Sequence, residues 1–151
     1  PSSVFETEGI WFTIPDHLLE DAGLDQRTVP GALHAAEHAG IAILPLFTIC
    51  DRWDVGGIST AWLDELGTAA VVIYDGCPGG AGIAELGYEA APRQLSATLE
   101  VLLGCACDSG CPSCVQSPKC GSWNEPLSKP GAAALLRAAG VEVPAHDPHG
   151  P

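Results

Sequence analysis

Residues 105–120 read CACDSGCPSCVQSPKC, and this stretch holds five of the seven cysteines in the 151-residue chain. An odd number of closely spaced cysteines is poorly suited to a disulfide framework and typical of a metal site. Zinc prefers four soft or borderline ligands at the corners of a tetrahedron, and the C-x2-C turn of Cys111 and Cys114 supplies two of them from one tight loop. The pattern therefore predicts a structural zinc site, one ion per chain.

Two further thiols would complete such a site. We expect the ligand set to be Cys107, Cys111, Cys114 and Cys120, because Cys107 and Cys120 flank the C-x2-C turn at comparable reach. Cys105 is the alternative to Cys107, on the expectation that two cysteines separated by a single residue do not easily bind the same ion. An iron–sulfur cluster is the alternative cofactor, since four thiolates at mixed spacings also suit it. The colour of the purified protein would distinguish the two.

The charge of the chain is strongly negative and unevenly distributed. Six basic residues face nineteen acidic ones, for a formal net charge of −13, which argues against a surface that wraps nucleic acid. Both lysines of the chain, Lys119 and Lys129, lie in or just after the cysteine-rich segment, so a contact with a polyanion is best supported there. Neither lysine lies in a G-K-[ST] sequence, and the chain therefore has no Walker-type loop of an ATPase motor.

The length and composition predict one domain. A chain of 151 residues with 46% hydrophobic residues can bury one ordinary core, which we place in residues 1–143, followed by a frayed tail at 144–151. No signal peptide opens the sequence, and no apolar run approaches the roughly 18–20 residues that cross a bilayer. We expect no membrane contact and a reducing, cytoplasmic setting. The start at Pro1, without Met, is expected to mark a piece of a longer protein.

Hydrophobic patterns and turn residues predict a small α+β fold. Alternation and β-branched residues indicate strands, of which the second and third form a hairpin, while Ala-rich and capped segments indicate helices. Pro92 is expected to separate two helical pieces, and Ser128 is expected to cap the last helix, which Gly140 ends. The expected strands are 9–14, 58–63 and 68–74, and the expected helices are 29–43, 83–88, 94–103 and 128–137. The predicted fold is therefore a small antiparallel sheet packed with helices and a cysteine-rich zinc-binding loop.

The sequence His34-Ala35-Ala36-Glu37-His38 matches H-x-x-E-H, the inverted zinc-peptidase pattern. Helical spacing would place both histidines on one face with the glutamate beside them. A metallopeptidase is therefore an alternative function, although five-residue patterns arise often in Ala-rich helices. Its third ligand would have to come from a glutamate without a surrounding motif: Glu65, Glu85 or Glu89. The simpler interpretation is a helix whose histidines form hydrogen bonds inside the core or to Asp51 and Asp54.

Four stretches, in one order, together resemble a known family. They are LHAAEHA (33–39), CDRWDVGGIST (50–60), YDGCPGGAGIAE (74–85) and CDSGCPSCVQSPKCGSWNEPLSKPGA (107–132). Over about residues 29–138 the chain resembles the MrfA-type zinc-binding domain at the C-terminus of superfamily 2 DNA helicases, the group that includes MrfA and SftH. Several motifs in register are more specific than the cysteines alone.

The resemblance implies an accessory domain of an ATP-dependent 3′–5′ DNA helicase involved in DNA repair, which binds one zinc through four cysteines and helps to guide or separate DNA strands. It implies ATPase lobes upstream in the same polypeptide and single-stranded DNA as a partner. It also makes H-x-x-E-H part of a longer helical motif in proteins that are not peptidases. The expected DNA contacts are Lys119, Trp123, Asn124 and Lys129, a mixture suited to phosphate pairing and base stacking.

An acidic protein-docking module without a nucleic-acid role is the remaining alternative. Because phosphate contacts weaken steeply as salt rises, the affinity for single-stranded DNA across a salt series would separate it from a DNA-binding domain.

Overall fold

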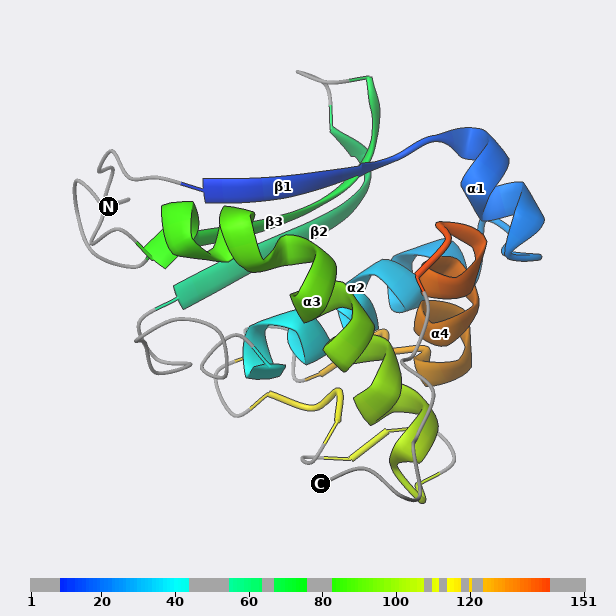
Figure 1. Ribbon diagram of the computed structural model, residues 1–151. Helices are drawn as coiled ribbons and strands as arrows, with labels where there is room; N and C mark the ends of the chain where they lie inside the picture. Colours follow the sequence, from blue (N-terminus) through cyan, green and yellow to red (C-terminus); the bar gives the residue numbers. More distant parts are fainter. Residues whose placement is uncertain are drawn as a thin grey trace, which may run out of the picture.

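The computed structural model describes residues 9–43, 55–63, 67–75, 83–107, 110–111, 114–117, 120 and 124–141. These residues form a three-stranded antiparallel sheet and four helices, which confirms the predicted α+β class (Figure 1). The elements in chain order are β1 Gly9–Ile14, α1 Asp16–Asp21, α2 Val29–Ile43, β2 Val55–Leu63, β3 Thr68–Asp75, α3 Ile83–Gly104 and α4 Lys129–Ala138. Among the described helices, none has the length and apolar character needed to cross a membrane.

The central strand of the sheet is β3, and the order is β1-β3-β2. Its β-branched run favours burial, and Val71 and Ile73 are buried on the face toward the helices. The predicted hairpin of β2 and β3 is confirmed, with Leu63 paired to Thr68. The connecting residues 64–66 lie outside the described part of the chain.

Helices α2, α3 and α4 lie together beside the sheet, while α1 follows the end of β1 (Figure 1). Figure 1 shows the sheet at the top of the view and α2, α3 and α4 gathered below it. Helix α2 is rich in Ala and Gly, and small side chains let neighbouring backbones approach closely. At Gly57 of β2, an added Cβ atom would lie 2.7 Å from Ile41 Cδ1 and 2.8 Å from Glu37 Cγ, both on α2. Glycine at this position therefore allows the sheet to pack directly on the helix that carries the two histidines.

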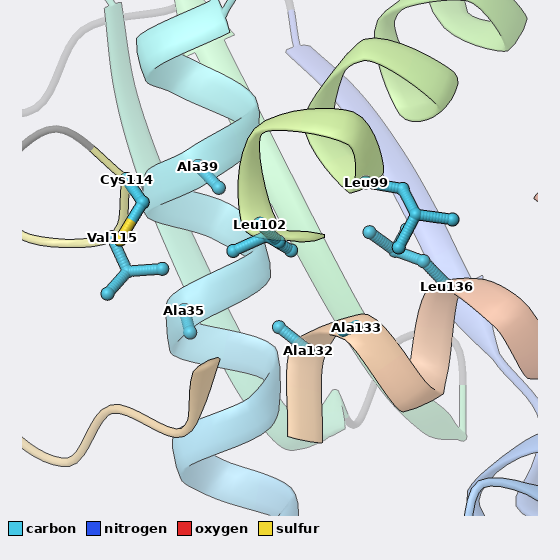
Figure 2. Close-up of a cluster of buried hydrophobic side chains, with 9 residues drawn as sticks. All are labelled: Ala35, Ala39, Leu99, Leu102, Cys114, Val115, Ala132, Ala133 and Leu136. Atoms are coloured by element: carbon cyan, nitrogen blue, oxygen red, sulfur yellow. The ribbon is translucent and has the colours of Figure 1, made fainter. Parts of the chain in front are cut away.

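The main core cluster joins three helices and the cysteine-rich segment. Cys114 and Val115 are almost fully buried, and Figure 2 shows them against Ala35 and Ala39 of α2. Side chains from α3 and α4 complete the cluster: Leu99, Leu102, Ala132, Ala133 and Leu136. The segment expected to bind metal is thus built into the hydrophobic core.

Helix α2 matches the expected range 29–43, whereas two other helices differ from the expectation. Helix α3 is continuous over 22 residues, so the predicted break at Pro92 is wrong. Pro92 is exposed and removes a single backbone donor, while buried residues such as Leu99 and Leu102 hold the helix on the core. Helix α1, a single six-residue segment, was not expected. The predicted start of α4 is confirmed, because Ser128 Oγ accepts a hydrogen bond of 3.1 Å from Gly131 N.

Candidate metal centre

Four cysteine thiols converge where α3 ends. The Sγ–Sγ distances are 3.6 Å for Cys105–Cys107, 3.5 Å for Cys105–Cys111, 3.5 Å for Cys107–Cys114 and 3.8 Å for Cys111–Cys114. All four sulfur atoms lie within 4.8 Å of one another. We call this group the four-thiol cluster.

The dimensions of the four-thiol cluster fit a single tetrahedral ion. With Zn–S bonds of about 2.3 Å, the edge of the sulfur tetrahedron is roughly 3.8 Å, and the four measured edges lie between 3.5 and 3.8 Å. In a four-iron cluster each thiolate binds a different iron atom, which separates the sulfurs by the width of the cluster. The spacing therefore favours one zinc ion over an iron–sulfur cluster.

A tight turn supplies the second pair of thiols. The backbone N–H groups of Cys114 and Val115 donate to the carbonyl oxygen of Cys111 at 3.1 and 3.2 Å. Gly110, just before this turn, has a φ of +130°, and an added Cβ atom would lie 2.5 Å from Val115 Cγ2. Glycine is thus required both by the backbone conformation and by the close approach of Val115.

The side chain of Lys129 forms hydrogen bonds with the four-thiol cluster. Although it is the first residue of α4, only 6% of its surface is exposed. Its Nζ donates hydrogen bonds to the carbonyl oxygens of Cys105 (2.9 Å) and Cys107 and to Cys107 Sγ (3.2 Å). The hydrogen bond from this ammonium group lowers the pKa of Cys107 to about 6. Lys129 therefore favours the thiolate form that a metal requires.

Cys114 has the opposite electrostatic setting. Burial raises its pKa to about 12, because its sulfur lies in the hydrophobic core with 1% of the residue exposed. A metal ion offsets this penalty by deprotonating a coordinating thiol outright. The core side of the cluster is therefore suited to a bound cation.

Cys120 does not lie with the four-thiol cluster. The structure brings Cys107, Cys111 and Cys114 together with Cys105, whereas Cys120 lies beside His34 and His38. The sulfurs of Cys105 and Cys107 lie 3.6 Å apart, which contradicts the expectation that these two cysteines do not easily bind the same ion. Residues two apart project to the same side of an extended chain. Cys105 is the first residue after α3, and its backbone N–H donates to Val101 O at 3.0 Å.

The H-x-x-E-H residues lie on α2 and face a cavity of about 690 Å³. His34 Nε2 lies 3.5 Å from Cys120 Sγ, and His38 Nε2 lies 3.8 Å from Glu37 Oε2. Burial raises the pKa of Glu37 to about 7. Of the glutamates considered as a third ligand, Glu65 and the side chains of Glu85 and Glu89 lie outside the described residues.

The residues expected to contact DNA have different settings. Lys129 is buried and directed at the four-thiol cluster, so its ammonium group is not presented to a ligand at the surface. Asn124, with a φ of +61°, bonds through both side-chain polar atoms to the backbone of Ser117. Lys119 and Trp123 lie outside the described residues. Lys129 is one of only two lysines in the chain. Nothing else in the sequence indicated that its side chain would bond to the four-thiol cluster.

A family model and several related proteins match this chain. The family model described as the MrfA Zn-binding domain matches residues 36–115. The uncharacterized protein MJ1572.1 of Methanocaldococcus jannaschii is 43% identical over 107 residues, covering 69% of this chain and 96% of that protein. The ATP-dependent helicase HRQ1 of Saccharomyces cerevisiae is 29% identical over 146 residues, covering 90% of this chain but 14% of the helicase.

A solved structure agrees in fold. The crystal structure of the DUF1998 helicase MrfA bound to DNA matches with a TM-score of 0.59 and 25% sequence identity, over 87% of this chain and 17% of that one. The chain therefore spans nearly all of the archaeal relative and about one sixth or less of the helicases it matches.

Proposed function

Because the chain belongs to the family of MrfA Zn-binding domains, we propose that it is the zinc-binding accessory domain of an ATP-dependent 3′–5′ DNA helicase that acts in DNA repair. The ATPase lobes would lie upstream in the same polypeptide, as its small share of the related helicases suggests. The four-thiol cluster is the observation that carries this proposal.

We assign the structural zinc to Cys105, Cys107, Cys111 and Cys114. Four thiolates around one ion leave no open coordination position, which is the arrangement of structural rather than catalytic zinc. Zn²⁺ with four thiolates has a formal charge of −2, and the ammonium group of Lys129 at 3.2 Å from Cys107 Sγ offsets part of it. A colourless purified chain that contains zinc would support the assignment. A brown protein would instead indicate an iron–sulfur cluster.

Zinc in this site would fix the cysteine-rich segment on the helical core. Cys105 follows α3, Lys129 begins α4, and His38 of α2 donates from Nδ1 to Val115 O at 2.7 Å. The ion would therefore connect three helices through one loop. We propose that this arrangement presents the cysteine-rich segment toward a DNA strand that leaves the ATPase lobes.

The proposed DNA contact now depends on Lys119 and Trp123. Lys119 would pair with a phosphate and Trp123 would stack on a base. Asn124 and Lys129 would act indirectly, since Asn124 holds the backbone of Ser117 and Lys129 holds that of Cys105 and Cys107. Because the remaining chain is strongly acidic, a phosphate contact is best supported in this region, which holds Lys119.

The test is strand separation by a helicase that contains this domain. Lys119→Ala should weaken binding of single-stranded DNA and reduce the slope of log affinity against log salt by about 1, while zinc content stays unchanged. Arg27→Ala is the matched control, since it removes one exposed positive charge far along the chain from the cysteine segment. Unwinding and salt slope unaffected by Lys119→Ala would contradict the DNA contact and favour a protein-docking role.

A further inference from the structure

A second group of metal-binding side chains lies outside the four-thiol cluster. His34 and His38 occupy successive turns of α2, and their ring centroids are 4.2 Å apart in an edge-on arrangement. One ring nitrogen of each histidine and the sulfur of Cys120 all lie within 4.8 Å of one another. We call this group the histidine cluster; it shares no residue with the four-thiol cluster.

Both rings are held in the orientation that a metal would need. His34 Nδ1 lies 2.8 Å from Pro126 O, and His38 Nδ1 lies 2.7 Å from Val115 O. A carbonyl oxygen only accepts hydrogen bonds, so each Nδ1 carries a proton, and in the neutral ring the lone pair is on Nε2. Metal-binding histidines are typically oriented in this way by a bond from the other ring nitrogen.

The histidine cluster opens into the cavity of about 690 Å³ between α2 and β2. His34, His38 and Cys120 line this cavity together with Glu37, whose Oε2 lies 3.8 Å from His38 Nε2. Gly57 lets β2 approach α2 at this point, so the wall of the cavity is fixed by backbone packing. A metal bound by the three side chains would therefore have a fourth position facing solvent.

We propose that His34 Nε2, His38 Nε2 and Cys120 Sγ bind a second zinc ion whose fourth position is open to this cavity. Two imidazoles and one thiolate are a ligand set of the borderline softness that zinc prefers. On binding, the Cys120 thiol loses its proton to solvent, and Zn²⁺ with one thiolate has a net charge of +1. The open position would then take a water molecule or a small oxyanion. This inference goes beyond the proposed function and assigns no reaction to the site.

Metal stoichiometry tests the proposal on the purified 151-residue chain. After zinc loading and removal of free metal, elemental analysis should find two zinc ions per chain. His34→Gln and Cys120→Ser should each leave one zinc ion, with an unchanged circular dichroism spectrum. Because the four-thiol cluster remains in both variants, the retained zinc ion reports that the chain is still folded. His17→Gln, which changes an exposed histidine of α1, is the matched control and should retain two.

X-ray absorption distinguishes the two sites by their ligands. The wild-type spectrum should contain nitrogen or oxygen scatterers beside sulfur, and the Cys120→Ser spectrum should show sulfur alone. A wild-type stoichiometry of one would overturn the proposal. So would retention of two ions in His34→Gln or in Cys120→Ser, because the second ion would then not depend on these ligands.

Discussion

The ammonium group of Lys129 offers the sharpest test of the four-thiol cluster. Lys129→Met keeps the length of the side chain and removes the donor to Cys105 O, Cys107 O and Cys107 Sγ. Side chains that hold metal ligands in place typically contribute 10–100-fold to metal affinity. Since Lys129 contacts two ligand residues through three hydrogen bonds, we expect zinc affinity at pH 7 to fall by roughly 10–100-fold.

The pH dependence should change in a defined direction. In the metal-free folded chain Lys129 holds the pKa of Cys107 at about 6, below the ordinary thiol value of 9.0. At pH 7 the Cys107 side chain is therefore mostly thiolate. Zinc binding then releases only a small fraction of a proton from it. Without the ammonium group its pKa rises, the thiol is protonated at pH 7, and zinc binding releases up to about one additional proton.

Calorimetry in buffers of different ionisation enthalpy measures both the affinity and the number of protons released. Competition with a chromophoric chelator gives an independent affinity. Arg137→Met is the matched control, because it removes an exposed positive charge from the last turn of the same helix. The reasoning is refuted if Lys129→Met binds zinc as tightly as the wild type with the same proton release, or if Arg137→Met loses as much affinity.

Two further predictions concern stability. Chelation of zinc should lower the Tm by roughly 8–16 °C, since metal at about 1,000 times its Kd stabilises by about 4 kcal/mol and each 1 kcal/mol shifts the Tm by about 2–4 °C at this size. Cys114→Ser should show a lowered Tm without chelator, and a smaller response to chelator than the wild type, in differential scanning calorimetry. Gly57→Ala should lower the free energy of unfolding by about 1–3 kcal/mol in urea titration, because its Cβ would lie 2.7 Å from Ile41 Cδ1. Gly104→Ala, with open space around the new Cβ, should change it by about 1 kcal/mol or less in the stabilising direction. A Tm insensitive to chelator, or equal effects of the two alanines, would contradict the respective prediction.

The regular elements were largely predictable because their signals are local. The hairpin of β2 and β3 follows from alternation and β-branched residues, and α4 follows from its N-cap at Ser128. The continuity of α3 was not predictable in the same way. Local rules end a helix at Pro92, whereas α3 continues past it, and burial of Leu99 and Leu102 against α2 and α4 anchors the half that follows the proline. Tertiary packing decided that element.

The grouping of the cysteines was harder to predict because it depends on long-range contacts. Spacing along the chain identified a metal site but did not determine which sulfurs face one another. Cys105 follows α3 directly, with its backbone N–H bonded to Val101 O, and its carbonyl oxygen accepts from Lys129, which is 24 positions further along the chain. Cys120 is directed to His34, which is 86 positions away. Neither of these two contacts can be recognised from a local sequence pattern.

Helix α2 connects these long-range relationships. Its carbonyl at Gly31 accepts a 2.9 Å hydrogen bond from Ser128 N at the start of α4, and His34 and His38 hold the backbone at Pro126 and Val115. The same two histidines provide the ring nitrogens of the histidine cluster. A zinc ion there would tighten the hold of α2 on both sides of the cysteine-rich segment, and loss of that ion would leave the four-thiol cluster intact. The two sites therefore have separable consequences: the first determines whether the segment folds, and the second determines how firmly it is positioned on α2.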